Sequence, residues 1–96
     1  MTILYEKELI GRIAYSKAGR DSGRMFIIWD VIDSEYVYII DGDLRKIERP
    51  KKKKLKHLNI TNEVVDVIRE LIISGESISN AKIRKCLENR YDIKEG

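Results

Sequence analysis

Cysteine and proline are almost absent from this chain, which has one of each in 96 residues. The lone cysteine, Cys86, excludes an internal disulfide and is typical of a reducing compartment. One cysteine and one histidine also fall short of the four ligands of a usual structural zinc site. We therefore expect neither a metal nor another cofactor.

Long apolar runs are missing too. No stretch approaches the ~20 residues of a membrane-spanning helix. The first eight residues have neither the basic region nor the apolar run of a signal peptide. These absences predict a soluble, cytoplasmic protein, which we expect to be a monomer.

The sequence also lacks organised catalytic patterns. It has no glycine-rich loop ending in Lys-Ser or Lys-Thr to hold phosphates, and no serine, histidine and acid that can be placed together. Its aspartates are scattered at expected turns, where this residue type commonly forms the turn itself. We expect that the protein is not an enzyme.

Positive charge is concentrated in one segment. The net charge is only +3, but residues 45–58 carry eight Lys or Arg against one Glu, a net +7. Residues 1–44 carry five against eight, and residues 59–96 carry six against seven. A polyanion would be attracted to the central segment and to little else.

The spacing of apolar residues changes near residue 59. Before it, short runs rich in Ile, Val and Tyr predict strands over 9–15, 24–32, 36–40, 44–48 and 55–60. The pair Asp41-Gly42 is a strong hairpin signal between the third and fourth of these strands. Short strands joined by tight turns indicate a small antiparallel barrel.

After residue 59 the spacing is helical. Thr61 or Asn62 is expected to cap a first helix that ends at Ser74-Gly75. Ser79 or Asn80 is expected to cap a second helix, with Ile83, Leu87 and Tyr91 on its apolar face.

The second and third strands are apolar on both faces, with Met25, Ile27, Trp29 and Val31 assigned to one face of the second. One face can line the barrel interior, and the helices should cover the other. Phe26, Trp29, Tyr36 and Tyr38 are expected in the core. Residues 1–60 are expected to form the barrel, and residues 61–96 a helical extension of the same domain.

The segment 9–32 resembles a KOW motif, because an apolar strand with a central glycine leads to the loop 19–24, Gly-Arg-Asp-Ser-Gly-Arg, and then to a strongly hydrophobic strand. Residues 37–42 and 52–58 extend the likeness. The chain is thus similar to KOW-motif RNA-binding proteins related to KOW-type large-subunit ribosomal proteins, such as the eukaryotic and archaeal protein fourteen and short bacterial relatives.

This resemblance implies a mainly β protein with α: a small SH3-like antiparallel β-barrel followed by two short helices. It implies association with RNA, especially ribosomal RNA or the large subunit. The motif glycines fall on Gly11, Gly19, Gly23 and Gly42. Asp21 and the modest net charge depart from a typical ribosomal protein, and they favour a factor that binds RNA reversibly.

Candidate RNA-binding residues come from the motif loop and the basic segment. A solvated, lysine-rich surface that only aids solubility is the alternative. Tyr15 borders the motif loop and is a candidate for stacking on a base. The full set is Tyr15, Lys17, Arg20, Arg24, Arg45, Lys46, Arg49, Lys51, Lys52, Lys53, Lys54, Lys56 and His57.

Two other hypotheses remain open. Residues 61–91 have the spacing of a helix-turn-helix, with Lys82, Arg84, Lys85 and Arg90 on the second helix. SH3-like barrels also serve as protein-interaction adaptors, in which case the lysines contribute only solubility.

Overall fold

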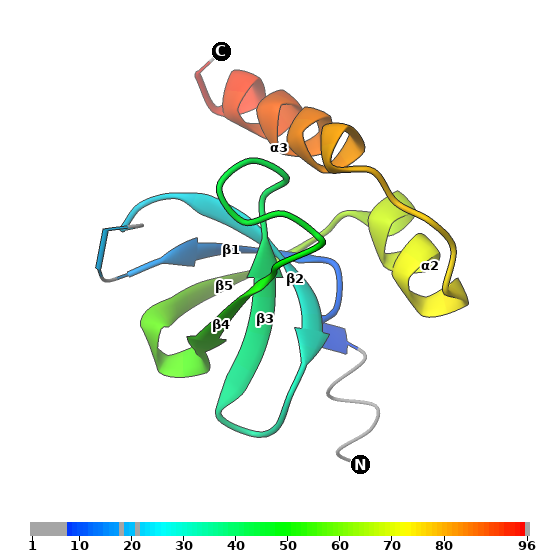
Figure 1. Ribbon diagram of the computed structural model, residues 1–96. Helices are drawn as coiled ribbons and strands as arrows, with labels where there is room; N and C mark the ends of the chain where they lie inside the picture. Colours follow the sequence, from blue (N-terminus) through cyan, green and yellow to red (C-terminus); the bar gives the residue numbers. More distant parts are fainter. Residues whose placement is uncertain (1–7, 18, 21, 96) are drawn as a thin grey trace.

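The computed structural model describes residues 8–17, 19–20 and 22–95, with side chains of the last helix described as far as Asn89 (Figure 1). Asp21 and the side chains of Arg90 and Tyr91 therefore lie outside the described residues. No helix in the described part of the chain is long and apolar enough to span a membrane. The elements are β1 (Arg12–Ser16), β2 (Met25–Val31), β3 (Tyr36–Ile40), β4 (Lys51–Lys54), the 3-10 helix η1 (Leu55–His57), β5 (Leu58–Val64), α2 (Asp66–Ser74) and α3 (Asn80–Glu95).

The five strands form one antiparallel sheet in the order β4-β3-β2-β1-β5. Strands β1 to β4 follow each other as a meander, and β5 returns to pair with the free side of β1. The two helices come after the last strand and lie at one end of the sheet (Figure 1). This arrangement confirms the predicted class, a small SH3-like antiparallel barrel followed by two helices.

Two apolar clusters lie on opposite faces of the sheet. Phe26 and Ile28 of β2 pack inside the barrel with Ala14, Val37, Ile39 and Leu58. Met25 and Ile27 point the other way, toward the helices. The cluster around them contains Ile13, Ile40, Val65, Ile68, Ile78, Ile83 and Leu87. The prediction that the helices cover one face of the second strand is therefore confirmed.

A β-bulge at Trp29 corrects the assignment of faces along β2. Ile28 pairs with Ile39 and Asp30 pairs with Tyr38, so Trp29 has no partner of its own in the register. After this extra residue, the side chains of β2 point to the opposite faces from those that a regular strand would give. Val31 consequently packs against the interior cluster rather than on the face of Met25 and Ile27.

Several predicted element boundaries are wrong. Leu9 lies in a helical turn, and the first strand begins only at Arg12. Residues 44–48, predicted as a strand, form part of the loop 41–50 between β3 and β4, so the tight hairpin predicted at Asp41-Gly42 is wrong. Residues 55–60 are divided between η1 and the start of β5.

The first helix also begins later than predicted. Thr61 and Asn62 lie inside β5, where the Thr61 hydroxyl donates to the carbonyl oxygen of Ile13 (2.7 Å). Val65 precedes α2 without a side-chain cap. Gly75 ends that helix and the Ser79 hydroxyl oxygen accepts from the backbone N–H of Lys82 (3.1 Å), as the sequence predicts.

The loop 41–50 is fastened to the start of α3. The Asn80 side chain accepts from the backbone N–H of Ile47 (2.9 Å) and donates to Glu48 (2.8 Å). One turn later, the Arg84 guanidinium donates to the carbonyl oxygen of Gly42 (2.7 Å). These bonds make the position of the loop depend on the docked helix.

Gly42 is predicted to be the glycine least tolerant of a side chain. Its φ is 78°, and a Cβ there would overlap the backbone carbonyl oxygen of Asn80, which cannot rotate away. Gly42→Ala should therefore add an overpacking cost of about 1–3 kcal/mol to the roughly 1–2 kcal/mol of a left-handed alanine. Chemical denaturation measures the loss of stability.

Gly23→Ala is the matched control for this prediction. Its φ of 83° is similar, but among the described residues no atom outside the glycine and its two chain neighbours lies within 4 Å of the added Cβ. Gly23→Ala should therefore lose only the stability that a left-handed alanine costs, without the overpacking cost. Equal destabilisation of the two variants would contradict the close approach of Gly42 to α3.

Candidate nucleic-acid interface

The lysine run is itself an edge strand of the sheet rather than a loop. As β4 it pairs with β3, placing Lys54 opposite Tyr36 and Lys52 opposite Tyr38. Because side chains alternate along a strand, these two lysines share the outer face with the two tyrosines. Lys51 and Lys53, opposite Ile39 and Val37, lie on the side of the barrel interior.

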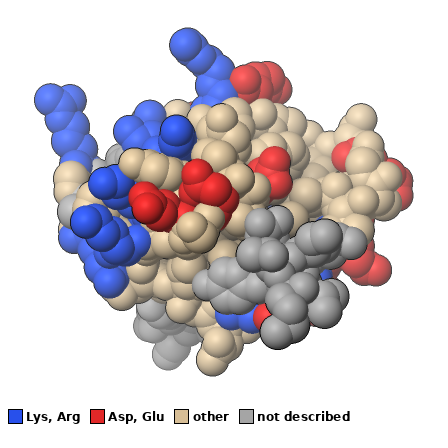
Figure 2. Space-filling view, turned by 90° about the horizontal axis from the view of Figure 1, so that it is seen from below, with Lys and Arg blue, Asp and Glu red and all other residues tan. Residues whose placement is uncertain are grey.

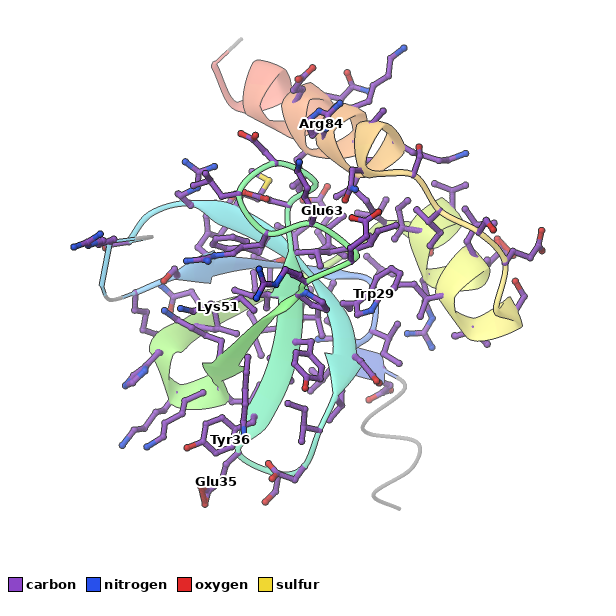
Figure 3. All side chains as sticks on the ribbon, in the orientation of Figure 1. Trp29, Glu35, Tyr36, Lys51, Glu63 and Arg84 are labelled. Carbon is purple, nitrogen blue, oxygen red and sulfur yellow. The ribbon has the colours of Figure 1, made fainter. Side chains whose placement is uncertain are left out.

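Tyr36 and Tyr38 correct the prediction that all mid-strand aromatics are in the core. Both are half-buried on the outer face, whereas Ile40, two residues further along that face, is completely covered. Tyr36 lies at the end of the sheet far from both helices (Figure 3). The helices lie over the other end of the sheet and leave this end uncovered (Figure 1). The alternation of side chains along β3 predicts that Tyr36, Tyr38 and Ile40 share one face. It does not predict how much of that face the helices cover.

The Tyr36 ring is in contact with the neighbouring lysines. The Nζ of Lys52 lies 4.6 Å from the ring centroid, and that of Lys54 lies 5.8 Å away. Both distances are within the range of a cation–π interaction. The strand pairing thus creates an exposed aromatic flanked by two positive charges.

The loop 41–50 brings further positive charge to β4. A shallow depression of about 510 Å³ lies between them, lined by Leu44, Arg45, Arg49, Pro50, Lys51 and Lys52. Leu44 is 59% exposed, and Lys46 is exposed nearby in the chain. Arginine, lysine and an apolar side chain therefore meet around one open hollow.

The helix η1 joins this region to the motif loop. The backbone N–H of Leu55 donates to the carbonyl oxygen of Glu35 (2.8 Å), and that of Lys17 donates to the carbonyl oxygen of His57 (2.8 Å). Lys17 and Arg20 are exposed, as is Lys56. We call the exposed or half-exposed basic residues of this region the basic surface: Lys17, Arg20, Arg45, Lys46, Arg49, Lys51, Lys52, Lys53, Lys54 and Lys56.

Positive charge gathers at one side of the molecule when it is seen from below, with carboxylates next to it (Figure 2). A second depression, of about 380 Å³, is lined by Ser34, Glu35, Lys54, Leu55 and Lys56. Basic and acidic side chains are therefore neighbours at this end of the barrel. A polyanion has a preferred side to approach.

Three of the predicted site residues, Arg24, Tyr15 and His57, lie outside the basic surface. Arg24 forms an ion pair with Asp41 (3.1 Å), whose side chain is 5% exposed. Tyr15 is half-buried and packs against the cluster under the helices. His57 is half-buried at the end of η1. Arg24 was expected to contact RNA, and here it contacts the Asp41 carboxylate.

In the described ranges, 8–17, 19–20 and 22–95, no three His, Cys, Asp or Glu side chains form a cluster that could hold a metal ion. Cys86 is half-buried against the cluster that contains Ile83 and Leu87. That position suits a small apolar side chain.

Among the known proteins that this chain matches are large ribosomal subunit proteins named eL14. The chain is 33% identical to large ribosomal subunit protein eL14 of Staphylothermus marinus over 60 residues, which is 62% of each chain. It is 35% identical to eL14 of Desulfurococcus amylolyticus over the same shares, and 28% identical to eL14 of Pyrobaculum islandicum over 62% of this chain and 58% of that protein.

The chain is similar to eL14. The resemblance to KOW-type large-subunit ribosomal proteins is thereby confirmed. The match spans less than two thirds of the length of these eL14 proteins. No protein-family model matches the chain.

Glu48 lies within the loop 41–50, and its carboxyl group has a shifted pKa. The hydrogen bond from Asn80 lowers its pKa below the ordinary value of 4.5, helped by a backbone hydrogen bond and by the charge of Lys46, while desolvation opposes the shift. Because the pKa of this carboxyl group is lower in the folded state than in the unfolded state, its ionised form stabilises the fold at a pH above the unfolded-state pKa. This stabilisation is lost as the pH falls through the folded-state pKa. The contact between the loop and α3 should therefore weaken in acid.

Asn80→Ala should raise the pKa of Glu48 toward its ordinary value, because it removes the largest cause of the shift. An NMR titration of the Glu48 side-chain carboxyl carbon measures the change. Lys82→Ala, also in the first turn of α3, is the control and should leave the titration unchanged. An unaltered Glu48 pKa in Asn80→Ala would show that the hydrogen bond is absent in solution.

Proposed function

We propose that this protein binds RNA through the basic surface, and that the RNA belongs to the large ribosomal subunit or its precursors. The observation that carries the proposal is the lysine edge strand, in which four consecutive lysines stand next to Arg45, Arg49 and Lys56. Lysine provides a mobile point charge that suits phosphate groups rather than base edges. The surface should therefore give affinity without marked sequence preference.

A plain structural role for the lysines is the main alternative to phosphate binding. Lysines on an edge strand prevent pairing with a second sheet, and natural proteins use them in this way. That role accounts for Lys51 to Lys54, since all four lie on the edge. It does not account for Arg45, Arg49 and Lys56, which lie outside the strand yet beside it.

The similarity to eL14 supports the large subunit as the location of this RNA. The net charge of +3 is low for permanent burial in ribosomal RNA, and the carboxylates beside the basic surface limit its attraction to phosphate. We therefore propose a reversible, salt-sensitive association. The proposal assigns no catalytic step to the protein.

We further propose that the barrel and helices act as one domain, with the helices holding the loop 41–50 in place. Asn80 and Arg84 make this link, so Arg84 has a structural partner in Gly42. We also assign Arg24 and Tyr15 to the fold rather than to RNA contact, because Arg24 pairs with Asp41 and Tyr15 packs under the helices.

Replacing Lys51, Lys52, Lys53 and Lys54 with Gln should weaken RNA binding by similar factors for different sequences. Each lysine whose ion pair with a phosphate is removed should reduce the slope of log K against log salt by roughly 0.7–0.9. Fluorescence anisotropy at several salt concentrations measures both effects. An unchanged slope would mean that the strand does not touch phosphate.

The matched control is Lys82→Gln with Lys85→Gln, two exposed lysines of α3. This pair should leave the slope close to that of the wild type. If instead the α3 pair abolishes binding and the β4 variant does not, the helix-turn-helix hypothesis is favoured. If the wild type binds no RNA even at low salt, the adaptor hypothesis is favoured.

In a sucrose gradient at low salt, the protein should travel with large-subunit particles. It should leave them at a few tenths molar salt, where charges are screened beyond roughly 5 Å. Immunodetection across the gradient fractions measures the distribution. If the protein stays at the top of a low-salt gradient but binds RNA in vitro, a messenger or small RNA becomes the better assignment.

A further inference from the structure

The outer end of β3 carries an aromatic side chain that the hydrophobic core does not explain. Tyr36 is half-exposed, lies away from both helices, and has no place in either apolar cluster of the described residues (Figure 3). Phe26, in contrast, is completely buried inside the barrel. The surroundings of Tyr36 therefore need an explanation other than packing.

The backbone at Tyr36 is held in place by the preceding turn. Asp33 Oδ1 accepts from the backbone N–H of Glu35 (2.8 Å) and from that of Tyr36 (2.9 Å). The opposing strand fixes the other side through the pairing of Tyr36 with Lys54. A ring attached to a fixed backbone loses little freedom on binding a ligand, so this position is pre-organised.

The charges around the ring are arranged asymmetrically. Lys52 and Lys54 lie over the ring from the side of β4, whereas Asp33 and Glu35 lie in the turn that precedes it. A phosphate would be drawn to the lysine side and repelled from the turn. A planar group attached to that phosphate would then lie over the ring.

We infer that Tyr36 is a stacking platform for an unpaired base of RNA, with Lys52 and Lys54 binding the phosphate of the same nucleotide. This inference rests on the proposed function and specifies which form of RNA the basic surface prefers. Stacking of a base on an aromatic ring is worth more than an exposed cation–π contact, so the lysines can move from ring to phosphate. A base inside a duplex is already stacked, so single-stranded or bulged RNA should be preferred.

Tyr36→Leu tests this inference, because it keeps an apolar side chain but removes the ring. It should weaken binding to a single-stranded RNA of about 12 nucleotides by roughly fivefold or more. Binding to a duplex of the same length should change by less than about twofold, since phosphate contacts remain. Fluorescence anisotropy of both labelled RNAs provides the comparison, and Tyr36→Phe should behave as wild type.

Tyr38→Leu is the matched control. Tyr38 lies on the same face of the same strand, between Lys52 on one side and Asp30 on the other, and the carboxylate of Asp30 disfavours a nearby phosphate. It should reduce single-strand binding less than Tyr36→Leu does. Equal affinities of wild type and Tyr36→Leu for the single strand, or equal weakening on strand and duplex, would overturn the inference while the proposed function stands.

A measurement on the wild-type protein avoids dependence on the folding of a variant. Stacking should move the NMR signals of the Tyr36 ring protons upfield when single-stranded RNA is added, and duplex RNA should leave them nearly unchanged. Absence of an upfield shift with bound single strand would contradict stacking. If wild-type protein binds neither RNA, the proposed function itself fails together with the inference.

Discussion

Both faces of strand β2 must be shielded from water, because Phe26 and Ile28 point to one side while Met25 and Ile27 point to the other. Curling of the sheet buries the first pair. The second pair needs a separate cover, which α2 and α3 provide. Burying a large aliphatic or aromatic side chain contributes roughly 1.5–3 kcal/mol before entropy, so an uncovered face would cost a large part of a small domain's stability.

This cover has consequences for the basic surface. The helices shield only the part of the outer face around Met25, Ile27 and Ile40, and they leave Tyr36 and Tyr38 half-exposed. The start of α3 also holds the loop 41–50 through Asn80 and Arg84. One packing requirement therefore decides both where the loop lies and which aromatic side chains remain accessible.

Edge position and positive charge act together in β4. The strand lies at one edge of the observed sheet, and lysines discourage another strand from pairing there. The same lysines, together with Arg45 and Arg49, are suited to phosphate. A role in preventing aggregation and a role in binding RNA therefore do not exclude each other, and only the second predicts a change in the salt dependence of RNA binding.

The sequence by itself determined the class of the fold, the concentration of charge, the glycine needed for a positive φ at position 42 and the end of α2 at Gly75, because these depend on local spacing and backbone conformation. It did not determine that the lysines form β4, since a run of four lysines has low strand propensity and pairs only because β3 offers it an edge. The contact of Arg24 with Asp41 and the exposure of Tyr36 were likewise decided by the tertiary structure. Both depend on residues distant in the chain, and on which part of one face the two helices cover.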